Sequence, residues 1–190
     1  ITFTVVGGAD RFGKDTSQLN RNLAFETSIV EFSLLGEYYL LDIENTRYSP
    51  YIFTGLALFH FNPYAYTPTK QKVFLKPLST EGQGVAGYPD RKPYKLTQIA
   101  IPFGGGVKFA ATDKIRVGVE MGIRKLFTDY LDDVSTTYVD PNDLLAARGQ
   151  LAVDMSYRGD EAAGIPLYPS KGYQRGNDKI KDYYYFGALH

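Results

Sequence analysis

The sequence predicts an all-β protein, an antiparallel up-and-down transmembrane β-barrel with long extracellular loops. Three observations predict this fold. Apolar and polar residues alternate along several segments, several of these segments exceed the length of strands in soluble sheets, and long and short connections alternate between them. We expect a single outer-membrane β-barrel domain over residues 1–190, because a length near ~150 residues favours one domain over two.

The clearest alternation covers residues 115–124. Five apolar side chains are predicted to point one way, namely Ile115, Val117, Val119, Met121 and Ile123. The residues between them are charged or glycine, which is typical of a strand with two different faces. Five further segments complete a predicted set of six strands: residues 1–8, 30–40, 51–61, 97–110 and 182–190. The segment 51–61 is apolar on both faces, so its orientation stays open.

Connections of alternating length separate these strands. Residues 9–27, 62–96 and 128–181 form long connections, whereas 42–47 and 111–114 form short ones. Outer-membrane barrels place short turns at the periplasmic end and long loops outside, and structureless loops beyond ~12–15 residues are uncommon in compact soluble domains. The longer strands also approach the ~9–11 residues that a tilted strand needs to cross a bilayer. Together these features favour a membrane barrel over a soluble lipocalin-like one.

The six predicted strands are fewer than an outer-membrane barrel needs to close. Single-chain bacterial outer-membrane barrels contain at least ~8 strands, and an open edge in lipid would leave backbone groups unpaired at several kcal/mol each. We therefore expect an eight-stranded barrel of which about six strands are present. The first hairpin would precede Ile1, and the closing strand would run past His190.

The composition excludes several classes of protein. Because 21 basic and 21 acidic residues give a net charge of zero, a nucleic-acid partner is not expected. The absence of cysteine excludes disulfide scaffolds and thiolate metal sites. No apolar run approaches the ~18 residues of a membrane helix. Aromatic residues gather near the predicted strand ends, as in the interfacial girdles of membrane barrels.

The polar face of the predicted barrel carries charges of both signs. The predicted lumen residues are Glu31, Glu37, Lys108, Arg116, Glu120 and Arg124. Eight strands leave an interior just wide enough for side chains, and a lone charge in a dry interior is costly. We therefore expect a filled, salt-bridged lumen, with an ion path as the alternative.

Glycine and proline interrupt the segment 97–110. Gly104, Gly105 and Gly106 do not form a phosphate loop, because no Lys-Ser or Lys-Thr pair follows. Glycines inside a strand relieve curvature or permit a close backbone approach. Pro102 removes one hydrogen-bond donor from the ladder, which predicts a bulge or a sheet edge nearby.

The longest connection contains an acidic run, formed by Asp129, Asp132, Asp133, Asp140 and Asp143. These residues fail the EF-hand spacing. A calcium site of another kind stays open, but a solvated or partner-binding loop is the favoured interpretation. Asp140 followed by Pro141 predicts the start of a helix, with Asp at the N-cap and Pro at the first position.

The sequence offers little for catalysis. His60 stands at the end of a predicted strand without a nucleophile motif, and His190 is the last residue. A lone histidine at an interface is structural more often than catalytic. We therefore expect no enzymatic activity, no cofactor and no metal site. A lipid-modifying enzyme that uses His60 is the least favoured alternative.

Several motifs resemble a known family. They are residues 19–25 (LNRNLAF), 51–63 (YIFTGLALFHFNP), 80–84 (TEGQG), 88–94 (YPDRKPY), 101–106 (IPFGGG), 127–141 (FTDYLDDVSTTYVDP), 175–177 (RGN) and 181–186 (KDYYYF). Over nearly the whole chain they resemble the PorG-like outer-membrane barrels of the type IX secretion system in Bacteroidetes. The chain lacks the first strands of that family and the end of its last strand.

The resemblance implies a non-enzymatic anchoring or interaction subunit of a protein secretion complex in the bacterial outer membrane. Its expected partners are outer-membrane lipid and other secretion-system subunits, including a periplasmic ring of lipoprotein and partner protein. The candidate interaction residues on the loop motifs are Glu81, Gln83, Tyr88, Asp90, Arg91, Tyr94, Asp129, Asp132, Asp133, Tyr138 and Asp140.

Two questions stay open at this point. The long loops lie on the outer side, whereas the ring is periplasmic. The loops could fold back over the barrel mouth or contact another outer-membrane subunit. A small passive outer-membrane channel, or a stand-alone barrel, is the alternative function.

Overall fold

The computed structural model describes residues 1–112, 114–161 and 167–190. Residues 113 and 162–166 fall within two of the predicted connections and lie outside the described residues. The strands are β1 Thr2–Ala9, β2 Ala24–Tyr39, β3 Tyr48–Tyr66, β4 Lys72–Phe74, β5 Thr97–Ala110, β6 Arg116–Leu126 and β7 Tyr183–Leu189. The helices are η1 Asp10–Phe12, α1 Thr16–Arg21, η2 Lys76–Leu78, α2 Pro141–Arg148, α3 Gln150–Ser156 and η3 Gly159–Glu161.

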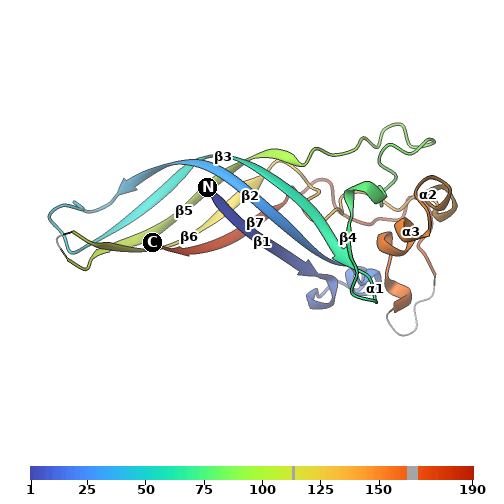
Figure 1. Cartoon of the computed structure of the whole chain (residues 1–190), viewed down its shortest axis with the longest axis horizontal. Helices are drawn as coiled ribbons and strands as arrows, with labels where there is room; N and C mark the ends of the chain where they lie inside the picture. Colours follow the sequence, from blue (N-terminus) through green and yellow to red (C-terminus); the bar gives the residue numbers. More distant parts are fainter. Residues whose placement is uncertain (113, 162–166) are drawn as a thin grey trace.

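The strands form one antiparallel sheet that curls into a nearly closed barrel (Figure 1). Its order is β1-β2-β3-β5-β6-β7, and the short strand β4 pairs with the loop-side end of β3. Within the described residues β1 and β7 are the two edge strands. The long connections gather at one end of the barrel, where they carry all of the described helices (Figure 1). The antiparallel barrel-like sheet predicted from the alternation is therefore confirmed.

All six predicted strands are present, but two of them are longer than predicted. β2 has 16 residues and β3 has 19. Both strands continue beyond the part in which their outward side chains are apolar. The outward positions there include Ser28, His60 and Asn62. The three-residue strand β4 was not predicted, since it lies inside the connection 62–96.

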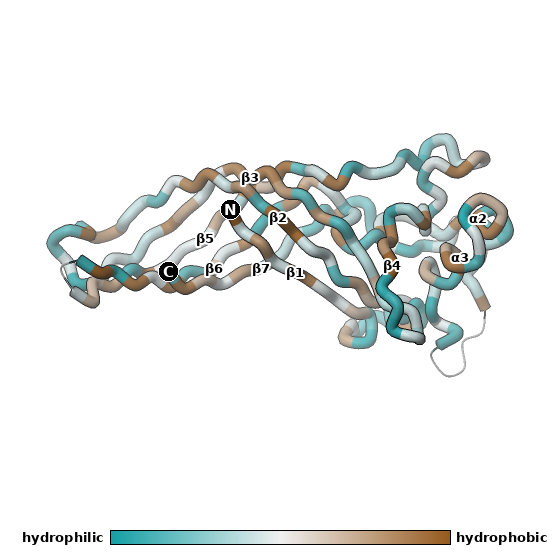
Figure 2. Tube along the Cα trace, in the orientation of Figure 1, coloured by the Kyte–Doolittle hydropathy of each residue, from teal (hydrophilic) through white to brown (hydrophobic). Residues whose placement is uncertain are grey.

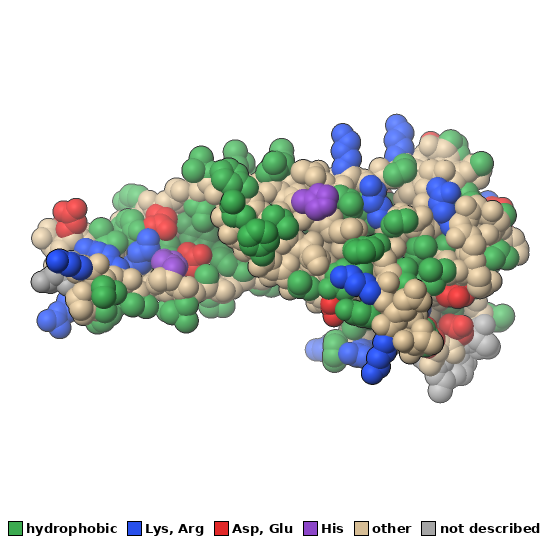
Figure 3. Space-filling model, in the orientation of Figure 1, with side chains coloured by type: hydrophobic (Ala, Val, Ile, Leu, Met, Phe, Trp, Pro, Cys, Tyr) green, Lys and Arg blue, Asp and Glu red, His purple; other side chains and the backbone are tan. Residues whose placement is uncertain are grey.

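The outward face of the barrel is apolar. Met121 is 73% exposed and Leu34 is 76% exposed, whereas Glu31 and Arg124 on the opposite faces of the same strands are buried. Brown and pale positions alternate along the strands in Figure 2. Figure 3 shows hydrophobic side chains over the middle of the barrel, with most Lys, Arg, Asp and Glu of this face toward the two ends. The stripe predicted along residues 115–123 points outward as expected.

The structure settles the orientation of β3. Tyr51, Phe53, Phe59 and Phe61 are buried inside the barrel. Near the loop-side mouth the interior is apolar, because Phe59 and Phe61 pack there with Tyr94 and Leu131 from the long connections. The predicted polar lumen therefore occupies only part of the interior.

The expectation of a bulge or sheet edge at Pro102 was wrong. β5 is an inner strand that pairs with β3 on one side and with β6 on the other. The β3–β5 register joins Thr54 to Phe103 and Ala57 to Ala100, so the offset is the same on both sides of the proline. The β3–β5 pairing is interrupted only between these two residue pairs, where Pro102 has no N–H to donate to β3.

Inward-facing glycines of β5 make room for aromatic rings of β3. A Cβ atom on Gly104 would lie 2.3 Å from the Met121 carbonyl oxygen and 2.6 Å from the Phe53 ring. A Cβ atom on Gly106 would lie 2.8 Å from the Tyr51 ring. Such distances require the neighbouring atoms to move, so Gly104 and Gly106 permit a close approach, which is one of the two roles expected of glycines in this strand.

Substitution of Gly104 by alanine should destabilise the barrel. We expect Gly104→Ala to lower the free energy of unfolding by about 1–3 kcal/mol, the usual cost of overpacking a core. Urea unfolding followed by circular dichroism would measure it. The matched control is Gly105→Ala, because Gly105 faces outward and the nearest atom to its Cβ lies at 3.1 Å. Equal losses in the two variants would contradict the packing role of Gly104.

Candidate functional site

The charged residues predicted for the lumen form two separate groups. Deeper in the barrel, Arg124 pairs with the buried Glu31 at 3.1 Å, and the Tyr184 hydroxyl also donates to Glu31 at 3.1 Å. Nearer the short turns, Lys108 pairs with Glu37 at 2.6 Å. The predicted pairing of opposite charges is therefore present at both levels.

Two of the predicted lumen residues have other partners. Glu120 accepts a hydrogen bond from the Tyr51 hydroxyl at 2.8 Å. Arg116 is exposed at the short-turn end and donates to the Ile43 carbonyl oxygen. Arg116 therefore stabilises the short connection 42–47 and does not belong to the ionic network of the interior.

The long connections fold into a compact cap over the loop-side mouth of the barrel (Figure 1). One apolar cluster of the cap contains Val85, Tyr88, Val139, Leu144 and Ala152. A second cluster joins the cap to strands β3 and β4, and contains Ala65, Val73, Leu75 and Met155. Because each cluster combines residues from different connections, the loops support one another as a small domain would.

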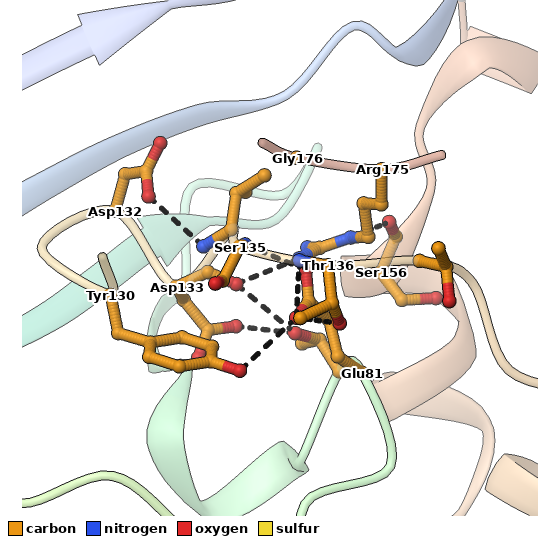
Figure 4. A network of polar contacts seen from close by, with 12 residues as sticks. Glu81, Tyr130, Asp132, Asp133, Ser135, Thr136, Ser156, Arg175 and Gly176 are labelled. Atoms are coloured by element: carbon orange, nitrogen blue, oxygen red, sulfur yellow. Dashed lines mark hydrogen bonds and ion pairs between the residues drawn. The ribbon is translucent and has the colours of Figure 1, made fainter. Parts of the chain in front are cut away.

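A buried carboxylate organises the centre of the cap. The Glu81 side chain is fully buried and accepts hydrogen bonds from the Ser135 backbone N–H at 2.8 Å and the Thr136 hydroxyl at 2.7 Å. Its ionic partner is Arg175, whose Nη1 lies 3.0 Å from Glu81 Oε1. Figure 4 shows these groups converging from different segments of the chain. The full set of partners compensates for burying the charge of Glu81.

Arg175 joins three parts of the cap. Besides Glu81, its guanidinium donates to the Asp133 carbonyl oxygen at 2.7 Å and to the Ser156 carbonyl oxygen at 3.1 Å. The Arg175 side chain is almost completely buried. Since its partners come from two of the three long connections, 62–96 and 128–181, Arg175 acts as the latch that holds the cap together.

Asp133 forms the second buried acid of the cluster. Its carboxylate accepts hydrogen bonds from the Tyr94 hydroxyl at 2.7 Å and from the Thr80 hydroxyl at 2.5 Å. Burial raises the pKa of Asp133 to about 6, although Arg175 and these donors act in the opposite direction. Desolvation therefore outweighs the favourable contacts of this carboxyl group.

The cap is attached to the barrel at several points. The Thr27 hydroxyl on β2 donates to the Leu131 carbonyl oxygen at 2.5 Å, and the Leu131 N–H donates to Asp182 at 2.8 Å. The Tyr94 ring stacks on Tyr130 with a centroid distance of 4.6 Å. These contacts fix the loops over the mouth, which is the first of the two loop arrangements considered from the sequence.

Most of the predicted loop residues lie inside the cap and not on its surface. Those that are buried are Glu81, Gln83, Tyr88, Tyr94, Asp129, Asp133 and Tyr138. Arg91, Asp132 and Asp140 are partly buried, and Asp90 is exposed. The expectation of a solvated acidic loop was therefore wrong for Asp129 and Asp133, which are buried and accept hydrogen bonds within the cap, whereas Asp143 of the same run is exposed. Whether the surface of the cap contacts a partner stays a prediction.

Several of these residues have a clear structural role. The Arg91 guanidinium donates to the Glu81 and Thr137 carbonyl oxygens at 2.6 and 2.7 Å. Asp140 caps α2 by accepting from the Asn142 N–H at 2.8 Å, with Pro141 in the first turn, so the predicted helix start is confirmed. Arg175 was missed as a site residue, although the sequence motif 175–177 contains it.

The described residues offer few groups for chemistry. Within residues 1–112, 114–161 and 167–190, no group of three or more histidine, cysteine or acidic residues could hold a metal ion. In the same ranges no helix combines the length and apolarity needed to cross a membrane. His60 points outward, and its Nδ1 lies 3.0 Å from the Thr97 hydroxyl oxygen.

Loss of Arg175 should open the cap while the strands stay paired. Arg175→Ala leaves Glu81 buried without its cation, and breaking one side of a buried ion pair costs about 3–5 kcal/mol. We expect faster hydrogen exchange of the backbone amides in residues 79–94 and 129–139, with unchanged protection of β5 and β6. Lys171→Ala is the control, because the Lys171–Asp143 pair is exposed at 3.8 Å. Equal exchange in both variants would contradict the latch role.

The stability of the cap should fall as the pH rises. Burial and the nearby Asp182 carboxylate raise the pKa of Asp132 to about 8, and burial raises those of Asp133 and Asp182 to about 6. The folded protein thus holds these protons more tightly than the unfolded chain, where an Asp has a pKa near ~3.9. The stabilisation is full below that value and is lost as the pH rises toward 8.

Asp132 is the group that titrates at the upper end of this window. Asp132→Asn should therefore abolish most of the decrease in melting temperature between pH 6 and pH 8.5. The exposed Asp90→Asn should leave the decrease intact. A wild-type melting temperature that is constant over this interval would refute the assignment.

Comparison with known proteins places the chain in a family. No curated protein sequence matches the chain, and no solved structure matches it. The model of one protein family, described as "Domain of unknown function (DUF6089)", matches residues 2–144. That segment covers about three quarters of the 190 residues, including β1 to β6 and the part of the cap that contains Glu81 and Asp133. The chain therefore belongs to the DUF6089 family.

Proposed function

We propose that this chain is a β-barrel of the bacterial outer membrane that serves as a non-enzymatic anchoring or interaction subunit of a protein secretion complex, the type IX system. The observation that carries the membrane part of the proposal is the apolar outward face of the strands. A continuous apolar surface over several neighbouring strands is rare on monomeric soluble proteins and marks contact with lipid or another apolar surface.

The height of the apolar face fits a membrane. On β3 the outward apolar residues run from Tyr48 to Leu58, and on β5 from Ile99 to Phe109. Each run spans ten residue steps. At ~3.3 Å per residue and a tilt of about 40°, ten steps cover about 25 Å along the membrane normal, the usual height of the apolar band of outer-membrane barrels. We call this surface the apolar belt.

We propose that the complete barrel has eight strands. β1 pairs only with residues 24–31 of β2, and β7 pairs only with residues 119–125 of β6. The described strands thus leave backbone N–H and C=O groups without sheet partners along the outer edges of β1 and β7, which lipid cannot satisfy. Two further strands between β1 and β7 would pair with them.

The cap supports the interaction role. It is held by the buried Glu81–Arg175 ion pair and by apolar clusters, so it presents an ordered surface above the belt. The resemblance of its loop motifs to the PorG-like barrels of the type IX system supports a place beside other secretion subunits. Because the cap lies on the outer side, a periplasmic ring would have to contact the short-turn end of the barrel instead. A barrel whose mouth is filled by aromatic residues and covered by the cap is a poor channel, which disfavours the passive-channel alternative.

A charged residue in the middle of the apolar belt should prevent membrane insertion. Arginine at the midplane of a membrane barrel costs about 2–4 kcal/mol, so Met121→Arg should reduce recovery of the protein from washed outer membranes. The control is Met121→Leu. If the belt faces water instead, Met121→Arg will fold and fractionate as well as the wild type, and the proposal fails.

Affinity purification of the full-length protein from outer membranes in mild detergent tests the interaction role. We expect other secretion subunits to be recovered with the wild type, and fewer with Arg175→Ala, whose cap is opened. Recovery of the barrel alone would contradict the anchoring role. Ion conductance in planar bilayers would favour the channel instead. Altered membrane lipids that return to normal in His60→Ala would favour the lipid-modifying enzyme.

A further inference from the structure

The outer face of the barrel changes character directly beyond the loop-side border of the apolar belt. On neighbouring strands the outward side chains there are polar: Ser28 on β2, His60 and Asn62 on β3, Thr97 on β5, and Lys95 just before β5. The sheet register pairs Ser28 with Asn62 and His60 with Thr97. We call these five residues the donor patch.

The backbone holds the donor patch in place. The Phe61 N–H donates to the Leu96 carbonyl oxygen at 2.9 Å, which extends the β3–β5 ladder beyond Thr97 and makes Lys95 the next outward position. The Gln98 amide donates to the Lys95 carbonyl oxygen at 3.0 Å. The patch is thus a continuation of the sheet, with His60 and Thr97 in contact at 3.0 Å.

The donor patch is rich in hydrogen-bond donors and contains no carboxylate. Lys95, His60, Thr97 and Ser28 are exposed, and no ion pair within the described residues involves Lys95. The nearest outward carboxylate by register is Glu26, one outward position farther from the belt than Ser28. Glu26 is partly buried and accepts a hydrogen bond from the Tyr64 hydroxyl at 2.7 Å.

We propose that the donor patch binds a phosphate group of a glycolipid in the outer leaflet of the membrane. This inference rests on the proposed membrane function, because the belt then places the patch at the level where headgroups begin, on the side of the long loops. An ammonium group, a hydroxyl and an imidazole N–H on adjacent strands suit the oxygens of a phosphate monoester. The long loops of such barrels face outside, which selects the outer leaflet.

The test compares glycolipid binding by intact protein in detergent, measured by native mass spectrometry. The probes are a phosphorylated glycolipid, the same glycolipid after phosphatase treatment, and phosphatidylethanolamine. We expect the wild type to retain the phosphorylated glycolipid preferentially. The double variant His60→Ala, Lys95→Ala should retain it about tenfold less, since charge-assisted hydrogen bonds are the strong ones.

Lys114→Ala is the matched control, because it removes one exposed lysine at the opposite end of the barrel. Equal retention by the double variant and Lys114→Ala would overturn the inference, as would equal binding of the dephosphorylated glycolipid or of phosphatidylethanolamine. Far-ultraviolet circular dichroism of each variant confirms that the sheet is intact. A wild type that inserts into membranes but shows no phosphate preference sinks this inference alone, whereas failure to insert sinks the proposed function.

Discussion

The structure depends on a single constraint: neighbouring strands pair in one antiparallel sheet while their side chains alternate between its two faces. The period of two then decides which residues meet the outside and which meet the interior. In β6 it sends Met121 outward and Arg124 inward. Charges on the inward face are tolerated because they have partners, as Arg124 has in Glu31. The glycines of β5 follow from the same geometry, since an inward Cβ at Gly104 would collide with Phe53.

The cap must offset the conformational entropy that its long loops lose on ordering. Long loops lose much conformational entropy when they become ordered, and unlike the strands they have no regular backbone hydrogen bonds of a sheet to compensate for this loss. Here a buried ion pair joins Glu81 to Arg175, 94 residues apart in the sequence. Both side chains are almost completely buried, so each stabilises the other and neither can be removed without leaving an isolated charge. The raised pKa values of Asp132 and Asp133 show that burying so many acids has a cost, which aromatic stacking and apolar clusters help to offset.

The sequence was sufficient to predict local features and insufficient for distant ones. Alternation identified strands such as β5 and β6, and Asp140 with Pro141 identified the start of α2, because the signals lie within a few residues. The far end of β3 was missed, since its outward positions are polar once the belt ends. The burial of Glu81 was missed because its ionic partner is distant in the sequence. A polar residue in a loop is normally solvated, and its pairing with Arg175 depends on a fold that no local pattern encodes.

The attachment of the cap bears on how the molecule could serve as an anchor. Tyr94 and Leu131 belong to the loops, yet they pack into the same core as Phe59 and Phe61 of β3. Thr27 of β2 also donates a hydrogen bond to the Leu131 carbonyl oxygen. The cap is therefore continuous with the interior of the barrel and cannot swing open as a hinged lid would without exposing that core. A load applied to the cap would pass directly to the strands, which supports the proposed anchoring role over the passive-channel alternative.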